Sequence, residues 1–176
     1  MAVQFRIPKS VLRQAGLKAI SLIRERTLAG VDANGQPFAP YSQKPFARPL
    51  GGITRQTRAA LGQKLQVFTT SGGKKWAVIE GGYAAYKAAK RPNDGGKVNL
   101  SDTFGMLRAL TITKIDEGTN TVQIGFTREE EALKALYHNE VGVGSGRVVR
   151  RFMGLTVPEQ RDIIETVVSG GITILP

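Results

Sequence analysis

The clearest hydrophobic pattern in the chain lies between Ser10 and Ala29, where apolar residues recur at intervals of three and four positions. This spacing predicts an α-helix with one buried face, and the basic residues between them predict a solvated outer side. Ser10 is a favourable residue to cap the start of such a helix, and Gly30 is a favourable residue to end it. The apolar positions are Leu12, Ala15, Ala19, Leu22 and Ile23.

Two pairs of short segments rich in β-branched and aromatic residues predict β-hairpins. Residues 65–70 and 75–80 flank a Ser-Gly-Gly-Lys turn, and residues 110–116 and 121–126 flank a Glu-Gly-Thr-Asn turn. The alternation of apolar and polar residues in the last of these segments predicts that one face of the second hairpin is buried. Residues 172–175 have a similar composition, and we expect a last strand there.

Two further segments have the spacing of a capping box, in which a Ser or Thr and the Glu three residues later each accept a hydrogen bond from the other's backbone. Thr127 with Glu130 predicts the start of one helix, and Thr156 with Glu159 predicts the start of another. We also expect Ser101 to cap a short helix before the second hairpin. The apolar positions of the helix after Thr127 are Ala132, Leu133, Leu136 and Tyr137.

The helix predicted after Thr156 follows a basic, β-branched segment, residues 147–151, and an apolar corner, residues 152–155. The basic segment is typical of a strand or an extended arm. Apolar residues at helical spacing predict one buried face on the helix, and Gly170 is a favourable end. The positions expected on that face are Ile163, Ile164, Val167 and Val168.

Strand pairs joined by turns, with helices between them, indicate an α+β fold. We expect a mainly antiparallel sheet of hairpins packed with the N-terminal amphipathic helix and two or three further helices. At 176 residues the chain fits one domain, residues 1–176. Frequent Gly and Pro predict long, extended, basic loops near residues 31–64 and 81–99, with a short helix over residues 54–61.

The net charge of +11 is unevenly distributed. The first 100 residues contain 17 Lys or Arg and 4 Asp or Glu, whereas the remaining residues contain 8 and 10. Such asymmetry indicates a basic surface that faces nucleic acid or an acidic partner. The alternative is a solvated basic face that only aids solubility.

Composition also excludes several kinds of site. The chain has no Cys and one His, which excludes disulfides, thiolate metal sites and His-based metal clusters. His138 and Glu140 are two residues apart, and on a helix such residues point to different sides. We therefore predict no catalytic, cofactor-binding or metal site and no enzyme activity, with His138 as a structural hydrogen-bonding residue. An enzyme acting through His138 and Glu140 is the alternative.

The chain has no apolar run that approaches the length of a membrane span, and no apolar signal segment follows Met1. We therefore expect a soluble protein of the cytoplasm or of an assembly, without a membrane partner.

Four segments follow one another in a recognisable order. Residues 30–42, GVDANGQPFAPYS, have the pattern Gly-x-Asp-x-x-Gly-x-x-Phe-x-Pro-Tyr/Leu-Ser. Residues 99–112, NLSDTFGMLRALTI, look like a Leu-x-x-(Ser/Thr)-Gly-x-Leu helix that precedes a hairpin. The match runs from Thr103 to Leu107, with Phe104 inserted.

The third and fourth segments lie nearer the C-terminus. Residues 135–142, ALYHNEVG, resemble an Ala-x-x-His-x-x-Gly pattern with an extra residue before the last Gly. Residues 150–164, RRFMGLTVPEQRDII, are close to Pro-Ala-Arg-x-Phe-Leu-Gly-Leu-(Ser/Thr), with Val149 and Arg150 where Pro-Ala is usual. Together the four segments resemble the bacteriophage virion-morphogenesis protein family, which includes tail-completion, neck and tail-terminator proteins.

This resemblance implies a structural virion protein of the head–tail junction or tail end. Such a protein forms a homo-oligomeric ring that joins the head connector to the tail, and it is assembled in the host cytoplasm. Its expected partners are further copies of itself, other phage connector, neck and tail proteins, and packaged DNA through non-specific contact. A free basic nucleic-acid-binding protein is the alternative function.

The resemblance also suggests roles for individual residues. Aromatic residues of the loop and residues of the basic arm and apolar corner would contact a neighbouring subunit or partner, and other basic residues would face a DNA-conducting channel. The expected interface residues are Phe38, Tyr41, Phe46, Arg147, Arg150, Arg151, Phe152 and Leu155. The expected channel or DNA-facing residues are Arg48, Arg55, Arg58, Lys87, Lys90 and Arg91.

Overall fold

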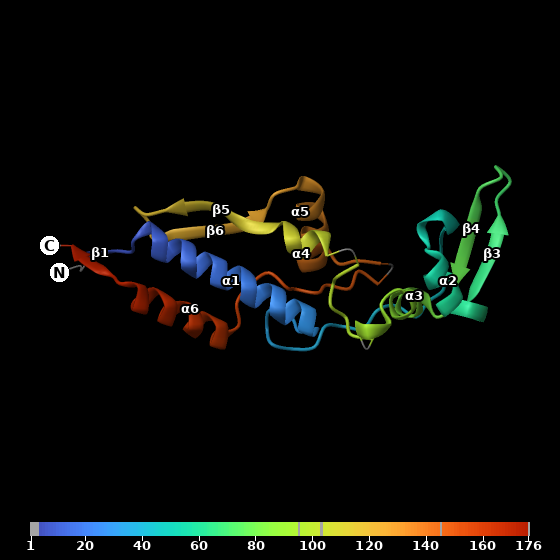
Figure 1. Cartoon of the computed structure of the whole chain (residues 1–176), viewed down its shortest axis with the longest axis horizontal. Coiled ribbons are helices and arrows are strands. Elements are labelled where there is room, and N and C mark those ends of the chain that lie inside the picture. The colour runs from blue at the N-terminus through green and yellow to red at the C-terminus, as the bar shows by residue number, and fades with distance from the viewer. Residues whose placement is uncertain (1–3, 95, 103, 145, 176) are drawn as a thin grey trace. The chain divides into compact units, whose positions relative to one another are not determined.

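The computed structural model describes residues 4–94, 96–102, 104–144 and 146–175. These residues form α-helices and antiparallel strands, which confirms the α+β class (Figure 1). We had expected one domain, but the chain divides into two compact units. Unit 1 comprises Met1–Phe38 and Asn99–Pro176, and unit 2 comprises Ala39–Val98.

Unit 1 is built around α1 (Lys9–Ala29), which packs on one side against a β-hairpin and on the other against α6 (Val157–Gly170) (Figure 1). The hairpin consists of β5 (Leu110–Asp116) and β6 (Thr121–Phe126), which confirms the second predicted hairpin. Apolar side chains from these elements meet at the start of α1. They are Ile7, Val11, Leu12, Ile115, Val122 and Val167.

The first and last described segments of the chain pair with each other. β1 (Gln4–Arg6) and β7 (Thr173–Leu175) are antiparallel, with Phe5 opposite Ile174. The predicted last strand is therefore confirmed. Its partner lies where the sequence predicted no regular structure.

The ends of α1 agree only in part with the prediction. The helix begins at Lys9 after Pro8, and no side chain caps it, so the prediction of Ser10 as the cap was wrong. Gly30 ends the helix in the left-handed conformation, with a φ of 89°, and its N–H donates to the carbonyls of Arg26 and Thr27. This is the expected glycine stop.

Gly16 allows α1 to approach the hairpin closely. A Cβ atom at this position would lie 2.8 Å from side-chain carbons of both Ile112 and Val122. Only glycine therefore fits at this point without movement of the hairpin side chains.

Of the three other predicted helix caps, two were also wrong. α4 (Gly105–Ala109) follows Phe104, and the Ser101 hydroxyl instead donates to the Asn99 side-chain oxygen. α5 (Glu129–Leu136) follows Arg128, and no side chain caps it, so Thr127 has no capping role. Thr103, the first residue of the predicted motif match, lies outside the described residues.

The predicted capping box at α6 is confirmed. The Thr156 hydroxyl accepts from Glu159 N at 3.4 Å, and Glu159 Oε2 accepts from Thr156 N at 2.7 Å. The helix includes Gly170 and is ended by Gly171, one residue later than expected.

Unit 2 contains a three-stranded antiparallel sheet in the order β2-β4-β3. β3 (Leu65–Thr69) and β4 (Lys75–Ile79) form the first predicted hairpin, which is confirmed. β2 (Phe46–Pro49) lies at the edge of the sheet and was not predicted. Its Pro49 is tolerated because an edge strand has one side without sheet partners.

Two helices of unit 2, α2 (Arg55–Leu61) and α3 (Gly82–Lys90), pack together and share one apolar core with the sheet. α2 matches the short helix expected over residues 54–61. The prediction of an extended loop over residues 81–99 was wrong, because α3 occupies its first half. The buried members of the core are Ile53, Leu61, Ala77, Ile79 and Tyr86.

Candidate assembly and binding surfaces

Phe152 is the centre of the segment with the strongest family resemblance, and its side chain is fully buried at 0% exposure. Its backbone is also held at both ends. Phe152 N donates to Asn139 Oδ1 at 2.9 Å, and Phe152 O accepts from Arg26 Nη2 at 2.7 Å. Phe152 is therefore a core residue of unit 1 rather than the exposed interface residue that we expected.

Asn139 connects this segment to the turn that follows α5. Its Oδ1 accepts from the backbone N–H groups of Phe152 and Met153, both at 2.9 Å, and its Nδ2 donates to Ala135 O at 2.8 Å. Asn139 is itself buried. The bonds to Ala135 and Phe152 are buried and the bond to Met153 is partly buried, so the loss of Asn139 as a partner is costly.

Arg26, near the end of α1, connects the same segment to α6. Its Nη2 donates to the carbonyls of Phe152 and Gly154, at 2.7 and 3.0 Å, and its Nη1 makes a salt bridge with Glu159. Glu159 is also the capping-box residue of α6. We call Arg26, Asn139, Phe152 and Glu159 the Phe152 latch.

The loop after α1 joins the latch through its backbone. Ala33 N donates to Arg151 O at 2.8 Å. Asp32 Oδ1 holds the loop by accepting from Asn34 N at 2.8 Å and Gln36 N at 2.9 Å. Phe38, expected at an interface, is buried in unit 1.

All four segments that carry the family resemblance therefore meet around the second half of α1. Three of them join through the latch and the Asp32 loop. The remaining segment, residues 99–112, is held by Arg24, which donates to the carbonyls of Leu107 and Leu110 at 2.8 and 2.7 Å.

The basic arm before Phe152 has only one of its arginines buried. Arg150 is buried, and its backbone N–H donates to His138 O at 2.7 Å, which contradicts its expected place at a surface. Arg147 and Arg151 are exposed, and Leu155 is half-buried. Arg147 has a φ of 44°, so the arm turns there rather than continuing as a strand.

His138 lies in a π-helical turn, Tyr137–Val141, which continues α5. Burial, assisted by the positive charge of Arg150, lowers the pKa of His138 to about 4, so the imidazole is neutral at pH 7. Its Nδ1 is buried and has no hydrogen-bond partner among the residues that the structure describes. Glu140 is exposed, whereas His138 is half-buried.

The outward side of α5 and its π-helical turn is apolar. Leu133, Leu136, Tyr137 and Val141 are between 43% and 52% exposed. We call these four residues the outer α5 face. The first three are among the apolar positions that the sequence showed for this helix.

The inward side of the same segment is polar. Glu131 and Asn139 are buried together with Ala135. Glu131 Oε1 lies 3.2 Å from Lys134 Nζ and 3.4 Å from Arg128 Nη2, so its charge is paired. Polar contacts thus fix the orientation of the helix, and its apolar side is left towards solvent.

α6 also exposes apolar residues. Ile163 and Val167 are half-buried, whereas Val157, Ile164 and Val168 are exposed. Of the four residues predicted on one buried face, Ile164 and Val168 therefore lie outside it. The exposed positions form a second apolar surface of unit 1.

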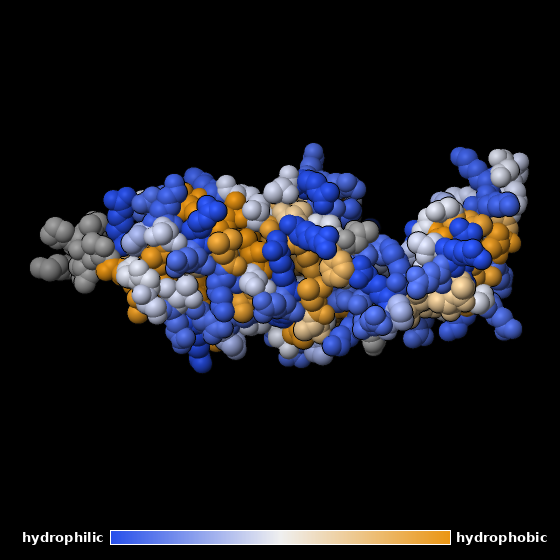
Figure 2. All heavy atoms as spheres, in the orientation of Figure 1, coloured by the Kyte–Doolittle hydropathy of each residue, from blue (hydrophilic) through white to orange (hydrophobic). Residues whose placement is uncertain are grey.

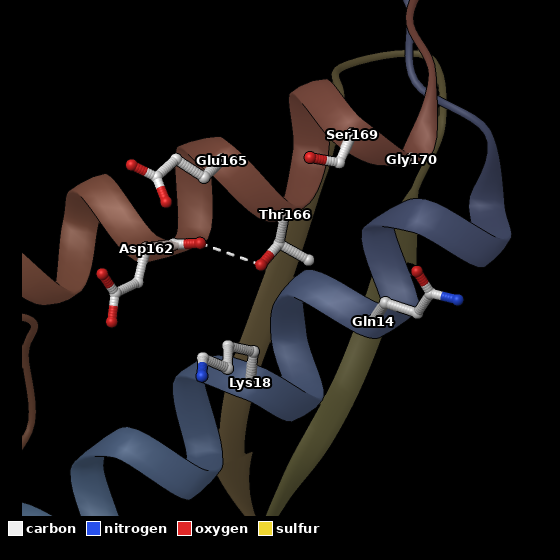
Figure 3. Close-up of a pocket in the computed structure, with 7 residues that line it drawn as sticks. All are labelled: Gln14, Lys18, Asp162, Glu165, Thr166, Ser169 and Gly170. Atoms are coloured by element: carbon white, nitrogen blue, oxygen red, sulfur yellow. Dashed lines mark hydrogen bonds between the residues drawn. The ribbon is translucent and has the colours of Figure 1, made fainter.

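A groove of about 480 Å³ lies between α1 and α6 (Figure 3). Gln14 and Lys18 line it from α1, and Asp162 and Glu165 line it from α6. The lining contains no His and no aromatic residue. No group of three or more His, Asp or Glu side chains in the described part of the chain could hold a metal ion.

In unit 2, most residues expected to face DNA instead contact the protein. Lys87 is buried, with Nζ 3.5 Å from Asp94 Oδ2. The Arg48 guanidinium lies over the Tyr86 ring, 4.5 Å from its centroid, and Lys90 Nζ lies 5.7 Å from the same centroid.

The remaining expected DNA-facing residues are Arg55, Arg58 and Arg91. Arg58 Nε donates to Ile53 O at 2.9 Å, and Arg91 is half-buried. Arg55 has an exposed side chain. Of the residues expected to face DNA, Arg55 is therefore the one whose side chain is exposed to a binding partner.

The aromatic residues expected at an interface join a cluster within unit 2. The Tyr41 and Tyr83 rings meet edge-to-face, with centroids 5.0 Å apart, and Phe46 lies 6.2 Å from both Tyr83 and Tyr86. Gly82 lets α3 approach the Tyr41 segment, because a Cβ there would lie 2.5 Å from Ser42 O. Tyr41 and Phe46 therefore stabilise unit 2 itself.

Sequence reasoning missed the outer α5 face. A signal was present, because Glu131, Ala135 and Asn139 recur at intervals of four and Leu133 and Leu136 occupy the positions between them. The sequence pattern alone gives no physical reason for Glu131 and Asn139, rather than the two leucines, to be buried.

No family model, curated protein or solved structure matches this chain. Among the described residues, each helix is too short or too polar to cross a membrane.

Proposed function

We propose that this protein is a non-enzymatic structural subunit of a phage virion, at the head–tail junction or the tail end. In this proposal it assembles with further copies of itself into a ring and joins neighbouring virion proteins. Two observations support it: the segments that resemble virion-morphogenesis proteins meet around the second half of α1, and unit 1 exposes an apolar helix face.

The outer α5 face carries the proposal. A surface helix of a monomeric protein normally turns its apolar stripe inward, and contiguous exposed apolar residues mark contact surfaces. Here the helix does the opposite, with Glu131 and Asn139 inside and Leu133 and Leu136 outside. Rotation of the helix would expose its apolar side less but would break the buried contacts of both polar residues.

The hydrogen bonds of the Phe152 latch hold the outer α5 face in one arrangement before assembly. Asn139 ties the turn after α5 to Phe152 and Met153, and Arg26 ties Phe152 to α1. A contact surface that is already ordered loses less conformational entropy on binding. The buried hydrogen bonds of unit 1 therefore favour association through α5.

A closed ring requires two different surfaces on each copy, since one patch must meet another patch on its neighbour. The exposed residues of α6, Val157, Ile164 and Val168, supply a second apolar surface on unit 1. A subunit with two such surfaces can bind one neighbouring copy through each of them and so form a ring. It can also contact proteins above and below that ring.

Sedimentation velocity of the purified chain tests the assembly. We expect the wild type to associate as its concentration rises and Leu136→Asp to remain monomeric, because a charge at the centre of an apolar contact is not compensated. Leu136 is half-exposed, so this variant retains its thermal stability. Leu17→Asp, at an equally exposed leucine of α1, is the matched control and should associate like the wild type.

Two results would contradict this part of the proposal: a wild type that stays monomeric at every concentration, or a Leu136→Asp variant that associates normally. The virion role is tested separately. Phage particles that encode this chain are purified and labelled with an antibody against it. We expect the label at the head–tail junction or the tail end.

A further inference from the structure

Unit 2 has an uncovered sheet face. Ala77 and Ile79 of β4 point into the core, with 0% exposure, so Trp76 and Val78 lie on the opposite face. Strand pairing places Phe68 of β3 directly opposite Trp76. Neither ring belongs to the apolar core of unit 2, and Phe68 is 42% exposed.

The neighbouring strand extends the same face. Pro49 of β2 lies opposite Trp76 on its other side. The sheet thus presents a ring of Trp and a ring of Phe side by side, next to a proline. Hydrophobic residues are visible at the surface in the region of β3 and β4 (Figures 1 and 2).

The surroundings of this face are strongly basic. Unit 2 contains 11 Lys or Arg and 2 Asp or Glu, a net charge of +9, whereas unit 1 contains 14 and 12. Lys64 precedes β3, and Lys74 and Lys75 lie at the other end of the hairpin. All three are exposed, and none takes part in a salt bridge among the residues that the structure describes.

We propose that this surface binds single-stranded nucleic acid. Phe68 and Trp76 stack with unpaired bases, and Lys64 and Lys74 contact the phosphates. Sequence-independent proteins for single strands combine these two features, a basic path and aromatic rings on which bases stack. We call these four residues the ribbon surface.

Charge argues for this occupant over a second copy of the same face. Two ribbon surfaces in contact would bring together two units of +9 each, whereas a polyanion neutralises that charge. Exposed aromatic rings argue for a single strand over a duplex. The bases of a duplex are stacked on one another, so their faces are covered.

This inference does not depend on the virion role. It also differs from the sequence prediction, which placed DNA contacts at Arg48, Lys87 and Lys90. These three cations are engaged with Tyr86 or Asp94, and the ribbon surface uses others.

Trp76 provides a direct readout because the chain contains one Trp. The full-length protein is titrated with oligo(dT) of about 20 nucleotides, and the fluorescence of Trp76 is recorded. We expect quenching as thymines stack on the indole, with an affinity that falls as salt is raised. A duplex of the same length should bind more weakly and quench less.

Variants separate stacking from charge. Phe68→Ala should weaken oligo(dT) binding about 5- to 150-fold, the range for loss of one stacked base. Lys64→Gln with Lys74→Gln should reduce the slope of log affinity against log salt by about 1.4, since each phosphate contact of a single strand contributes about 0.7. Phe5→Ala and the pair Lys9→Gln with Lys18→Gln, exposed on unit 1, are the matched controls and should change neither quantity.

Three outcomes would overturn the proposal. The first is absence of oligo(dT) binding by a folded wild type. The second is binding that leaves Trp76 fluorescence unchanged and is insensitive to Phe68→Ala, which would mean charge attraction alone. The third is tighter binding of the duplex. Since half-exposed Phe68 lies outside the core, an unchanged thermal midpoint shows that Phe68→Ala is folded.

Discussion

Units 1 and 2 are stabilised in different ways. Unit 1 joins segments far apart in the sequence through buried polar contacts, with Arg26, Asn139 and Glu159 holding backbone groups around Phe152. Unit 2 is formed by consecutive residues and has an apolar core flanked by an aromatic cluster, with cations lying over the Tyr86 ring. Unit 1 is nearly neutral, and unit 2 carries most of the net charge.

This difference suggests that the two units have different roles. Buried polar contacts demand specific geometry, so they give unit 1 one well-defined arrangement of the outer α5 face. In the described part of the chain, Lys64, Lys74 and Lys75 of unit 2 make no ion pair, and they can serve an anionic ligand. Loss of a latch residue should therefore cost more stability than loss of a cation from the aromatic cluster.

The largest effect is expected at the centre of the latch. Phe152→Ala should reduce the free energy of unfolding by about 3–5 kcal/mol, because it removes a fully buried ring and leaves a cavity. Urea unfolding followed by circular dichroism measures this loss. A change below about 1 kcal/mol would mean that the ring has no core role and would undermine the comparison.

Asn139→Ala should cost about 2–4 kcal/mol, because it leaves the N–H groups of Phe152 and Met153 buried without an acceptor. The same urea experiment applies. Asn93→Ala, at an exposed position of unit 2, is the matched control and should be nearly neutral. Equal effects of the two substitutions would contradict the role of Asn139 in the latch.

His138, in the turn that contains the latch residue Asn139, predicts a pH dependence. The pKa of His138 is about 4 in the folded protein and about 6.5 when unfolded, so the unfolded chain binds the proton more readily. Stability from this residue is complete above pH 6.5 and is lost as pH falls towards 4, by about 3 kcal/mol in total. The stability difference between wild type and His138→Gln should fall by that amount from pH 7 to 4, and a constant difference would contradict it.

The smallest effect is expected in unit 2. Arg48→Met keeps most of the side-chain volume but removes the cation over Tyr86, which should cost about 1 kcal/mol. Thermal unfolding followed by Trp76 fluorescence reports on the sheet of unit 2. A loss as large as that of Phe152→Ala would show that unit 2 depends on its cations as strongly as unit 1 depends on its latch.

The sequence predicted the elements whose local pattern agrees with their tertiary environment. The hairpin of β5 and β6 was predicted because its alternation matches a sheet with one face buried. The capping box at Thr156 was also predicted correctly, but the same spacing at Thr127 caps nothing because α5 begins later, at Glu129. A capping pattern thus identifies a helix more reliably than its first residue.

The parts that the sequence did not predict depend on contacts between distant segments. The π-helical turn after α5 buries Asn139, whose side chain accepts from Phe152 and Met153, and these residues are too far along the chain for a periodic pattern to connect. β2 was missed because Pro49 is compatible with a strand only at the edge of a sheet. The division into two units was missed for a similar reason, since unit 1 is completed by residues on both sides of unit 2.

Sedimentation velocity with a fluorescent oligo(dT) tests the central claim most directly, because one run reports both the mass of the protein and its binding. The claim is that assembly belongs to the outer α5 face and nucleic-acid binding to the ribbon surface. We predict that the wild type associates and binds, that Leu136→Asp is a monomer that still binds, and that Phe68→Ala associates but binds weakly. A wild type that neither associates nor binds, or a single substitution that removes both properties from a folded protein, would contradict the account.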